Sequence, residues 1–190
     1  MSVTTFRPAK PVVPIFTSVA DAFSPFAEPL VRGATGLLLV PHGAQKLFGW
    51  FGGYGLTGTG GFLEQLGFIP GRRNALFAGL AEFAGGLLLA LGLATPLAAT
   101  LIISVMFVAV ATVHVKNGYF NSSQGFEYNL TLAAVALSVA IIGAGPVSLD
   151  AALHLKDAGP IWGLAALVAG IGGGLVQLAG RRAPAAQKAN

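Results

Sequence analysis

The 190-residue sequence contains no cysteine. This absence excludes disulfide bonds, thiolate metal sites, cysteine nucleophiles and dithiol relays within the chain, so redox chemistry would need a bound cofactor or a partner protein. Charge is also scarce, because Asp, Glu, Lys and Arg make up only 9% of the residues, against about 25% in ordinary soluble domains. A soluble surface cannot be built from so few charged side chains.

The charged residues avoid three long stretches of the chain. Residues 75–115 hold only Glu82, and residues 128–149 and 158–180 hold none. About 20 apolar residues in a helix are enough to cross the hydrocarbon core of a bilayer. The sequence therefore predicts an all-α protein, an integral membrane helical bundle without a separate soluble domain. The net charge of +4 comes largely from residues that flank these stretches, which favours a membrane protein over a nucleic-acid-binding one.

Five membrane spans are predicted. They cover residues 30–48, 75–94, 96–115, 128–145 and 161–178, and the second and third meet in a tight turn at Thr95-Pro96. Residues 1–29 contain five prolines, so we interpret them as a tail rather than a long helix. Residues 61–68 are expected to form a short, half-embedded helix over a cavity, and residues 181–190 a basic, solvated C-terminal tail.

Consecutive spans alternate in direction, which determines the loops that share a side of the membrane. The loops after the first and third spans lie with the C-terminus on one side, here called side B. The opposite side, side A, holds the N-terminus and the loops after the second and fourth spans. Seven of the eleven Lys and Arg residues fall on side B. The positive-inside tendency therefore predicts that side B, with the C-terminus, is cytoplasmic.

Ionisable side chains within the spans gather at the side-B ends. Burying such groups in hydrocarbon costs roughly 2.5–3.5 kcal/mol on insertion scales, so they usually face a bundle interior or a wet cavity. One polar cavity formed by four spans accounts for their common depth. The candidate catalytic residues are Glu82 and His114, and the candidate ligand-binding residues are His42, Lys46, Glu127 and Tyr128.

Two interpretations of this cluster remain open. His42 and Lys46 are one helical turn apart, and Glu82, Gly86 and Ala90 repeat that spacing on the second span. The small residues of this stripe allow another helix to approach closely. Glu82 and Lys46 either form a structural ion pair between two helices or belong to a ligand or proton site.

Other candidate sites are weaker. Arg32, at the side-A end of the first span, is expected to form a structural ion pair with Asp150. His42 and His114 could be axial ligands of a haem, but histidines at span ends are more often interfacial. Because the chain has no local histidine pair with ligand spacing, we predict no metal site. The G-x-G-x-x-G match at residues 53–58 follows no strand and does not predict dinucleotide binding.

Four segments carry a family resemblance. They are PHGAQKLFG at residues 41–49, AEFAGGLLLALGLATPLAA at 81–99, MFVAVATVHVKNGYF at 106–120 and QGFEYNLTLAAVALSVAIIGAGPVSLD at 124–150. In this order and spacing they resemble the DoxX family of bacterial and archaeal membrane proteins. The resemblance spans residues 33–150 and implies a four-helix membrane core over residues 30–150. Residues 151–180 would then be an additional C-terminal span.

The resemblance implies a link to oxidoreductase complexes, since relatives include a subunit of thiosulfate:quinone oxidoreductase. The leading hypothesis is a membrane subunit of such an assembly, whose side-B pocket takes a quinone or a small oxidised or sulfur-containing substrate. The first alternative is a non-catalytic anchor or assembly factor. The second is a small-solute or proton transporter, which the lack of a visible inverted repeat disfavours.

The implied surroundings are the lipid bilayer of the plasma (inner) membrane of a bacterial cell, crossed several times. Other membrane or peripheral subunits are the expected protein partners, and a second copy of the chain is an open alternative. No nucleic acid is expected as a partner. A quinone is the one cofactor that the cluster suggests.

Overall fold

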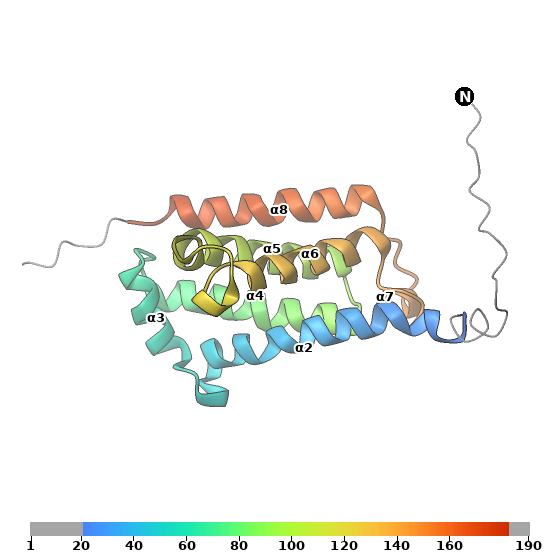
Figure 1. Ribbon diagram of the computed structural model, residues 1–190, viewed down its shortest axis with the longest axis horizontal. Coiled ribbons are helices and arrows are strands. Elements are labelled where there is room, and N and C mark those ends of the chain that lie inside the picture. Colours follow the sequence, from blue (N-terminus) through green and yellow to red (C-terminus); the bar gives the residue numbers. More distant parts are fainter. Residues whose placement is uncertain (1–20, 183–190) are drawn as a thin grey trace, which may run out of the picture.

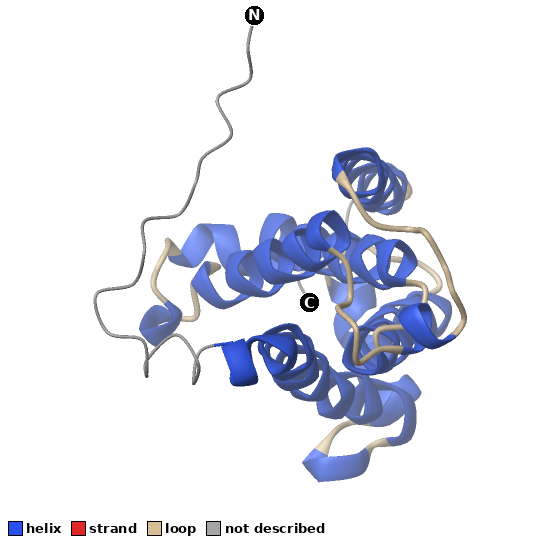
Figure 2. Ribbon diagram, turned by 90° about the vertical axis from the view of Figure 1, so that its right-hand side faces the viewer, coloured by secondary structure: helices blue, strands red, loops and turns tan. Residues whose placement is uncertain are grey.

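The computed structural model describes residues 21–182, which contain helices and loops and no β-strand (Figures 1 and 2). Five long helices lie side by side, each reversing the direction of the one before it in the chain (Figure 1). Their bounds are Ala27–Phe48 (α2), Gly71–Leu91 (α4), Thr95–Ala109 (α5), Glu127–Ile142 (α6) and Pro160–Ala179 (α8). Two shorter helices are Gly55–Gln65 (α3), at the left-hand end of Figure 1, and Leu149–Ala152 (α7), at its right-hand end. The predicted all-α bundle is confirmed.

Three of the helices within residues 21–182 are long and apolar enough to cross a membrane. They are α4, α8 and the helix of 23 residues from Thr95 to Asn117, in which α5 continues through a π-helical segment (Val110–His114) and a short 3-10 segment. Length and composition alone therefore support three of the five predicted spans, and the other two, α2 and α6, stay a prediction. With 22 residues α2 is long enough, but it carries charged and polar side chains, whereas α6 is apolar but has only 16 residues. At 1.5 Å per residue, α6 is shorter than the ~30 Å hydrocarbon core.

The predicted boundaries also shift at the chain ends. Helix α2 begins at Ala27 and follows a 3-10 turn at Ser24–Phe26, so the expected tail already becomes helical before residue 30. The rest of that predicted tail, residues 1–20, lies outside the described residues, as do residues 183–190 of the C-terminal tail.

The turn between α4 and α5 is as tight as the Thr95-Pro96 junction predicts. Helix α4 ends at Leu91, and Gly92 takes a left-handed conformation with φ 61°, which suits a residue without a side chain. Pro96 lies in the first turn of α5, where its missing N–H would have had no partner inside the helix.

Close contact between α2 and α4 depends on glycine. A Cβ atom on Gly36 would lie 2.3 Å from the carbonyl oxygen of Gly86, and one on Gly43 would lie 2.4 Å from the backbone nitrogen of Phe83. Both distances are far below van der Waals contact, so neither position accepts a larger residue without moving a helix. The prediction that the Glu82–Gly86–Ala90 stripe allows another helix to approach closely is confirmed.

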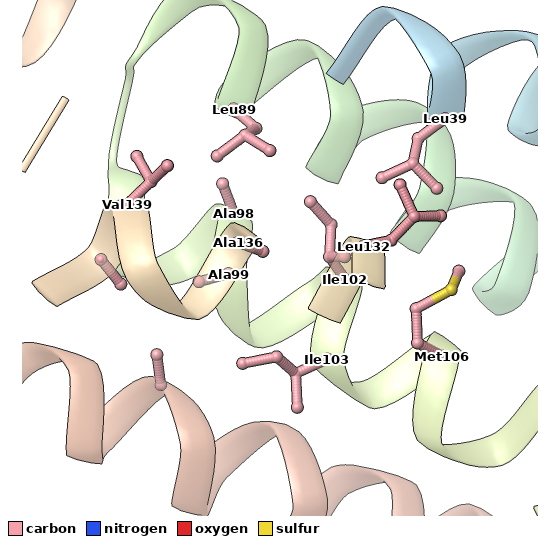
Figure 3. Packing of buried hydrophobic residues seen from close by; sticks show 12 residues of the cluster. Leu39, Leu89, Ala98, Ala99, Ile102, Ile103, Met106, Leu132, Ala136 and Val139 are labelled. Atoms are coloured by element: carbon pink, nitrogen blue, oxygen red, sulfur yellow. The ribbon is translucent and has the colours of Figure 1, made fainter. Parts of the chain in front are cut away.

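Helix α5 supplies the centre of the hydrophobic core (Figure 3). Ala98, Ala99, Ile102, Ile103 and Met106 are buried, because α4, α6 and α8 all pack against this helix. Helix α8 approaches with a stripe of small residues, Gly163, Ala166, Gly170 and Gly174. Its opposite face exposes Leu164, Val168, Leu175 and Val176, as expected for a helix that contacts lipid.

Arg32 of α2 and Asp150 of α7 do not form the predicted ion pair. The one ion pair among the described residues lies elsewhere. The Arg32 side chain donates hydrogen bonds to the backbone carbonyl groups of Ala90, Ala144 and Val147. These carbonyls lie where α4 and α6 end, so the guanidinium satisfies acceptors that have no partner within a helix.

The Asp150 carboxylate binds backbone N–H groups that have no partner at the start of α5. Its oxygens accept hydrogen bonds from the backbone N–H groups of Ala94 at 2.6 Å and Thr95 at 3.1 Å, and from the Thr95 hydroxyl at 2.5 Å. The predicted pair is wrong because unpaired backbone groups at helix ends compete for charged side chains where water is scarce.

Candidate functional site

The polar residues named above as site candidates lie toward the left-hand end of Figure 1, as the alternation of helix direction predicts. The C-terminal ends of α2 and α8 and the N-terminal ends of α4 and α6 all lie there, together with the helical continuation of α5. We keep the name side B for this end and side A for the other.

Lys46 and Glu82 form an ion pair between α2 and α4. The Lys46 Nζ atom lies 2.5 Å from the Glu82 Oε2 atom. The Glu82 side chain is 8% exposed and that of Lys46 is 29% exposed, so the carboxylate lies inside the bundle and the ammonium reaches its edge. The glycine contacts between α2 and α4 bring the two backbones close enough for this pair to form. The contact fits both interpretations of the cluster.

A cavity of about 620 Å³ opens beside Lys46. It lies between the end of α2, the turn at Trp50–Gly52 and α3, which folds back over α2. Its polar lining comes from Gln45, Lys46, Tyr54, Thr59 and Gln65. These residues supply an ammonium, two amides, two hydroxyl groups and an aromatic ring, a composition suited to a small, flat molecule with carbonyl groups.

The loop that follows α2 packs closely against the end of this helix and forms part of the cavity wall. The Gln45 amide donates a hydrogen bond to the Phe51 carbonyl at 3.1 Å. A Cβ atom on Gly53 would lie 2.4 Å from the Gln45 Cα atom, so only glycine lets the loop approach α2 this closely. The short helix predicted for residues 61–68 is confirmed in kind but begins earlier, at Gly55, and ends at Gln65.

Tyr128, from α6, lies beside His42 of α2. Their ring centroids are 6.3 Å apart and the rings are tilted by 56°. Tyr128 is half-buried against the core, within electrostatic range of Glu82, whereas His42 is exposed. Four of the six predicted site residues, His42, Lys46, Glu82 and Tyr128, are thus associated in two contacting pairs on three helices.

His114 and Glu127 take part in a separate network. The Nδ1–H group of His114 donates to the Gln124 carbonyl at 2.7 Å, since a carbonyl oxygen can only accept. A Glu127 carboxylate oxygen accepts the backbone N–H of Asn121 at 3.0 Å. Both side chains therefore hold the loop between α5 and α6. Among the described residues no hydrogen bond links them to Lys46 or Glu82.

The sequence analysis missed several polar residues. Tyr54, Thr59 and Gln65 line the cavity, but their glycine-rich segment indicated only interfacial aromatics and a short helix. Asn129 is 7% exposed, and its side-chain amide contacts the Met106 sulfur at 3.3 Å. An asparagine inside an apolar run was a detectable signal, because such residues usually face the bundle interior.

Residues 29–115 match the DoxX family model. Over these residues the chain is similar to the DoxX family. The match contains the Lys46–Glu82 pair and the cavity beside it, and it ends in the helical continuation of α5. It is shorter than the resemblance inferred from the sequence, which extended to residue 150. No curated protein and no solved structure matches the chain.

Proposed function

We propose that this protein is a membrane subunit of an oxidoreductase assembly, and that the cavity beside Lys46 binds the head of a quinone or a small oxidised or sulfur-containing substrate. One observation carries the proposal. In the Lys46–Glu82 ion pair the carboxylate is buried inside the bundle, while the Lys46 side chain lines a cavity of about 620 Å³. Ionisable residues within membrane helices are costly and usually functional.

The lining groups suit the chemistry of a quinone. The Lys46 ammonium and the Gln45 and Gln65 amides can donate hydrogen bonds to ring carbonyls, and Tyr54 and Phe62 offer aromatic surface. Reduction of a quinone to a quinol takes up two electrons and two protons. In this proposal the two electrons come from a partner subunit. Lys46 gives a proton to each developing oxyanion in turn, and it regains a proton through Glu82 after each transfer.

The other predicted site residues receive different roles. Tyr128 on α6 and His42 on α2 lie beside each other. Their side chains can pass protons between Glu82 and the edge of the bundle. We assign His114 and Glu127 to holding the loop between α5 and α6, because their hydrogen bonds go to Gln124 and Asn121. This differs from the catalytic role predicted for His114.

A non-catalytic anchor is the second candidate, and a specific observation favours it. The ion pair lies between two helices that already pack through glycine, so holding them together is a sufficient role for it. The two functions differ in one requirement. The oxidoreductase subunit needs a molecule bound in the cavity, whereas an anchor does not.

Extraction of quinone from protein purified out of native membranes in mild detergent tests the proposal. Gly61 lines the cavity, and a Cβ atom there meets nothing within 4 Å, so Gly61→Phe should fill the cavity without disturbing the fold. Gly33→Phe adds the same ring at an equally open position outside the cavity and is the matched control. Wild type and Gly33→Phe should retain quinone, and Gly61→Phe should lose most of it. Retention by Gly61→Phe at unchanged melting temperature, or no quinone in wild type, would favour the anchor.

We further propose that the protein lies in the plasma membrane with side B in the cytoplasm. The excess of Lys and Arg on side B supports this orientation, since seven of eleven fall there.

A further inference from the structure

A second cavity, of about 500 Å³, forms a groove along the bundle. Its floor is α5, with Leu101, Ser104, Val105 and Val108, and α4 and α8 supply its two walls. The lining is almost wholly apolar, and Ala81, Ala84 and Gly173 leave space where larger side chains would fill it. This groove does not include any residue of the Lys46 cavity.

The groove is bounded at its side-B end by the last turn of α3 and the segment between α3 and α4. Leu63 and Phe68 line it there, and the Arg181 guanidinium lies 5.3 Å from the centre of the Phe68 ring. The Nε–H group of Arg181 donates to the Leu66 carbonyl at 2.8 Å, and the backbone N–H of Arg182 donates to the Gly67 carbonyl at 2.9 Å. The end of α8 is thereby attached to the segment that bounds the groove.

Four exposed arginines adjoin the elements that form this end of the groove. Arg72 and Arg73 are exposed in the first turn of α4, directly before the groove-lining Asn74, and Arg181 and Arg182 follow α8. The nearby Glu64 carboxylate already accepts the backbone N–H of Gly71 at 2.9 Å. Four positive side chains thus adjoin the side-B end of an apolar groove, and the one carboxylate named there already accepts a backbone hydrogen bond.

We propose that the groove binds one acyl chain of an anionic phospholipid, whose phosphate is held by the arginines at the mouth. An apolar molecule alone would fit the groove but would supply no anion to balance the positive charge of the arginines. Basic pockets between membrane helices are a recurring way of binding acidic headgroups. A phospholipid with a net negative charge matches both the apolar groove and the charged mouth.

The test is native mass spectrometry of the full chain, released from vesicles with equal amounts of phosphatidylglycerol and phosphatidylcholine. The wild type should retain one phosphatidylglycerol in preference to phosphatidylcholine. Arg72→Gln/Arg73→Gln removes two exposed charges at the mouth and keeps the Arg181 contacts. This preference should then fall roughly tenfold or more. Lys116→Gln/Lys156→Gln removes two exposed charges away from the groove and should leave the preference unchanged.

A second variant pair tests the acyl chain. Ala84→Phe places a ring in the groove, whereas Ala134→Phe adds the same ring to an exposed position on α6. Only Ala84→Phe should reduce the number of bound lipids by one. Equal retention of both lipids by wild type, an unaltered preference in Arg72→Gln/Arg73→Gln, or a retained quinone in place of phospholipid would each overturn the proposal. Melting temperatures near wild type would confirm that the variants are folded.

Discussion

Buried charges in this protein bind the backbone as well as each other. Lys46 and Glu82 form an ion pair, whereas Arg32 and Asp150 bind carbonyl and N–H groups at helix ends. In an apolar surrounding both solutions avoid the cost of an unsatisfied polar group. The need to pair every buried polar group therefore explains both the Lys46–Glu82 ion pair at side B and the bonds of Arg32 and Asp150 to helix ends at side A.

The ion pair predicts strong coupling between its two residues. Removing one partner of a buried pair leaves an uncompensated charge and costs about 3–5 kcal/mol, and the partial exposure of Lys46 should reduce this. Glu82→Gln and Lys46→Met should each lower the melting temperature in detergent more than the double variant does. A double-mutant cycle should give a coupling of roughly 1–3 kcal/mol. Losses that simply add would mean that the two side chains do not interact.

The sequence predicted the Lys46–Glu82 contact because both residues stand at the same depth and beside small residues. It failed for Arg32 and Asp150, since their partners are backbone groups that no residue type reveals. The cavity residues Tyr54, Thr59 and Gln65 were missed for a related reason. They come together through the fold of a glycine-rich loop over α2, which leaves no periodic pattern in the sequence.

At the scale of the element, the contact between α2 and α4 predicts opposite effects of two matched substitutions. Replacing glycine by alanine in a helix normally adds up to about 1 kcal/mol of stability. Gly33→Ala should show this gain or no change, because its Cβ meets nothing within 4 Å.

Gly36→Ala should instead destabilise by about 1–3 kcal/mol, because its Cβ would lie 2.3 Å from the Gly86 carbonyl oxygen. Thermal unfolding in one detergent compares both variants with wild type. Equal melting temperatures for the two variants would contradict the close helix contact.

The helices most readily predicted were those with long apolar runs. Residues 75–94 and 161–178 were predicted as spans and form most of α4 and α8. Helix α3 was expected to begin only at Gly61, because glycine is unfavourable in a helix by about 1 kcal/mol per residue and this segment holds several. Packing overrides that preference, since a Cβ on Gly60 would lie 2.9 Å from the Arg72 backbone nitrogen.

The whole molecule has two chemically different ends. Side A is closed by Arg32 and Asp150, which satisfy the backbone at the turn between α4 and α5 and at the segment after α6. Side B holds the ion pair, its cavity and the end of the apolar groove that Leu63 and Phe68 line. Exchange of ligands and protons is therefore expected at side B.

Labelling of four exposed positions tests whether α2 and α6 cross the membrane, because their crossing changes the side on which these positions lie. The chain has no cysteine of its own that would react with the label. Single cysteines are introduced as Ser24→Cys, Gly61→Cys, Ser122→Cys and Lys156→Cys. If all five long helices span, positions 24 and 156 lie on side A, and positions 61 and 122 lie on side B. If only α4, the 95–117 helix and α8 span, all four positions lie on one side.

We expect the five-span pattern, because α2 and α6 lie alongside the three apolar helices throughout the bundle (Figure 1). An impermeant maleimide applied to intact inner-membrane spheroplasts should then label positions 24 and 156. Positions 61 and 122 should react only after permeabilisation if side B is cytoplasmic, as the excess of Lys and Arg on that side predicts. Labelling of each variant in detergent controls for reactivity. The reversed pattern would overturn the orientation alone, whereas equal labelling of all four would remove α2 and α6 from the membrane-spanning set.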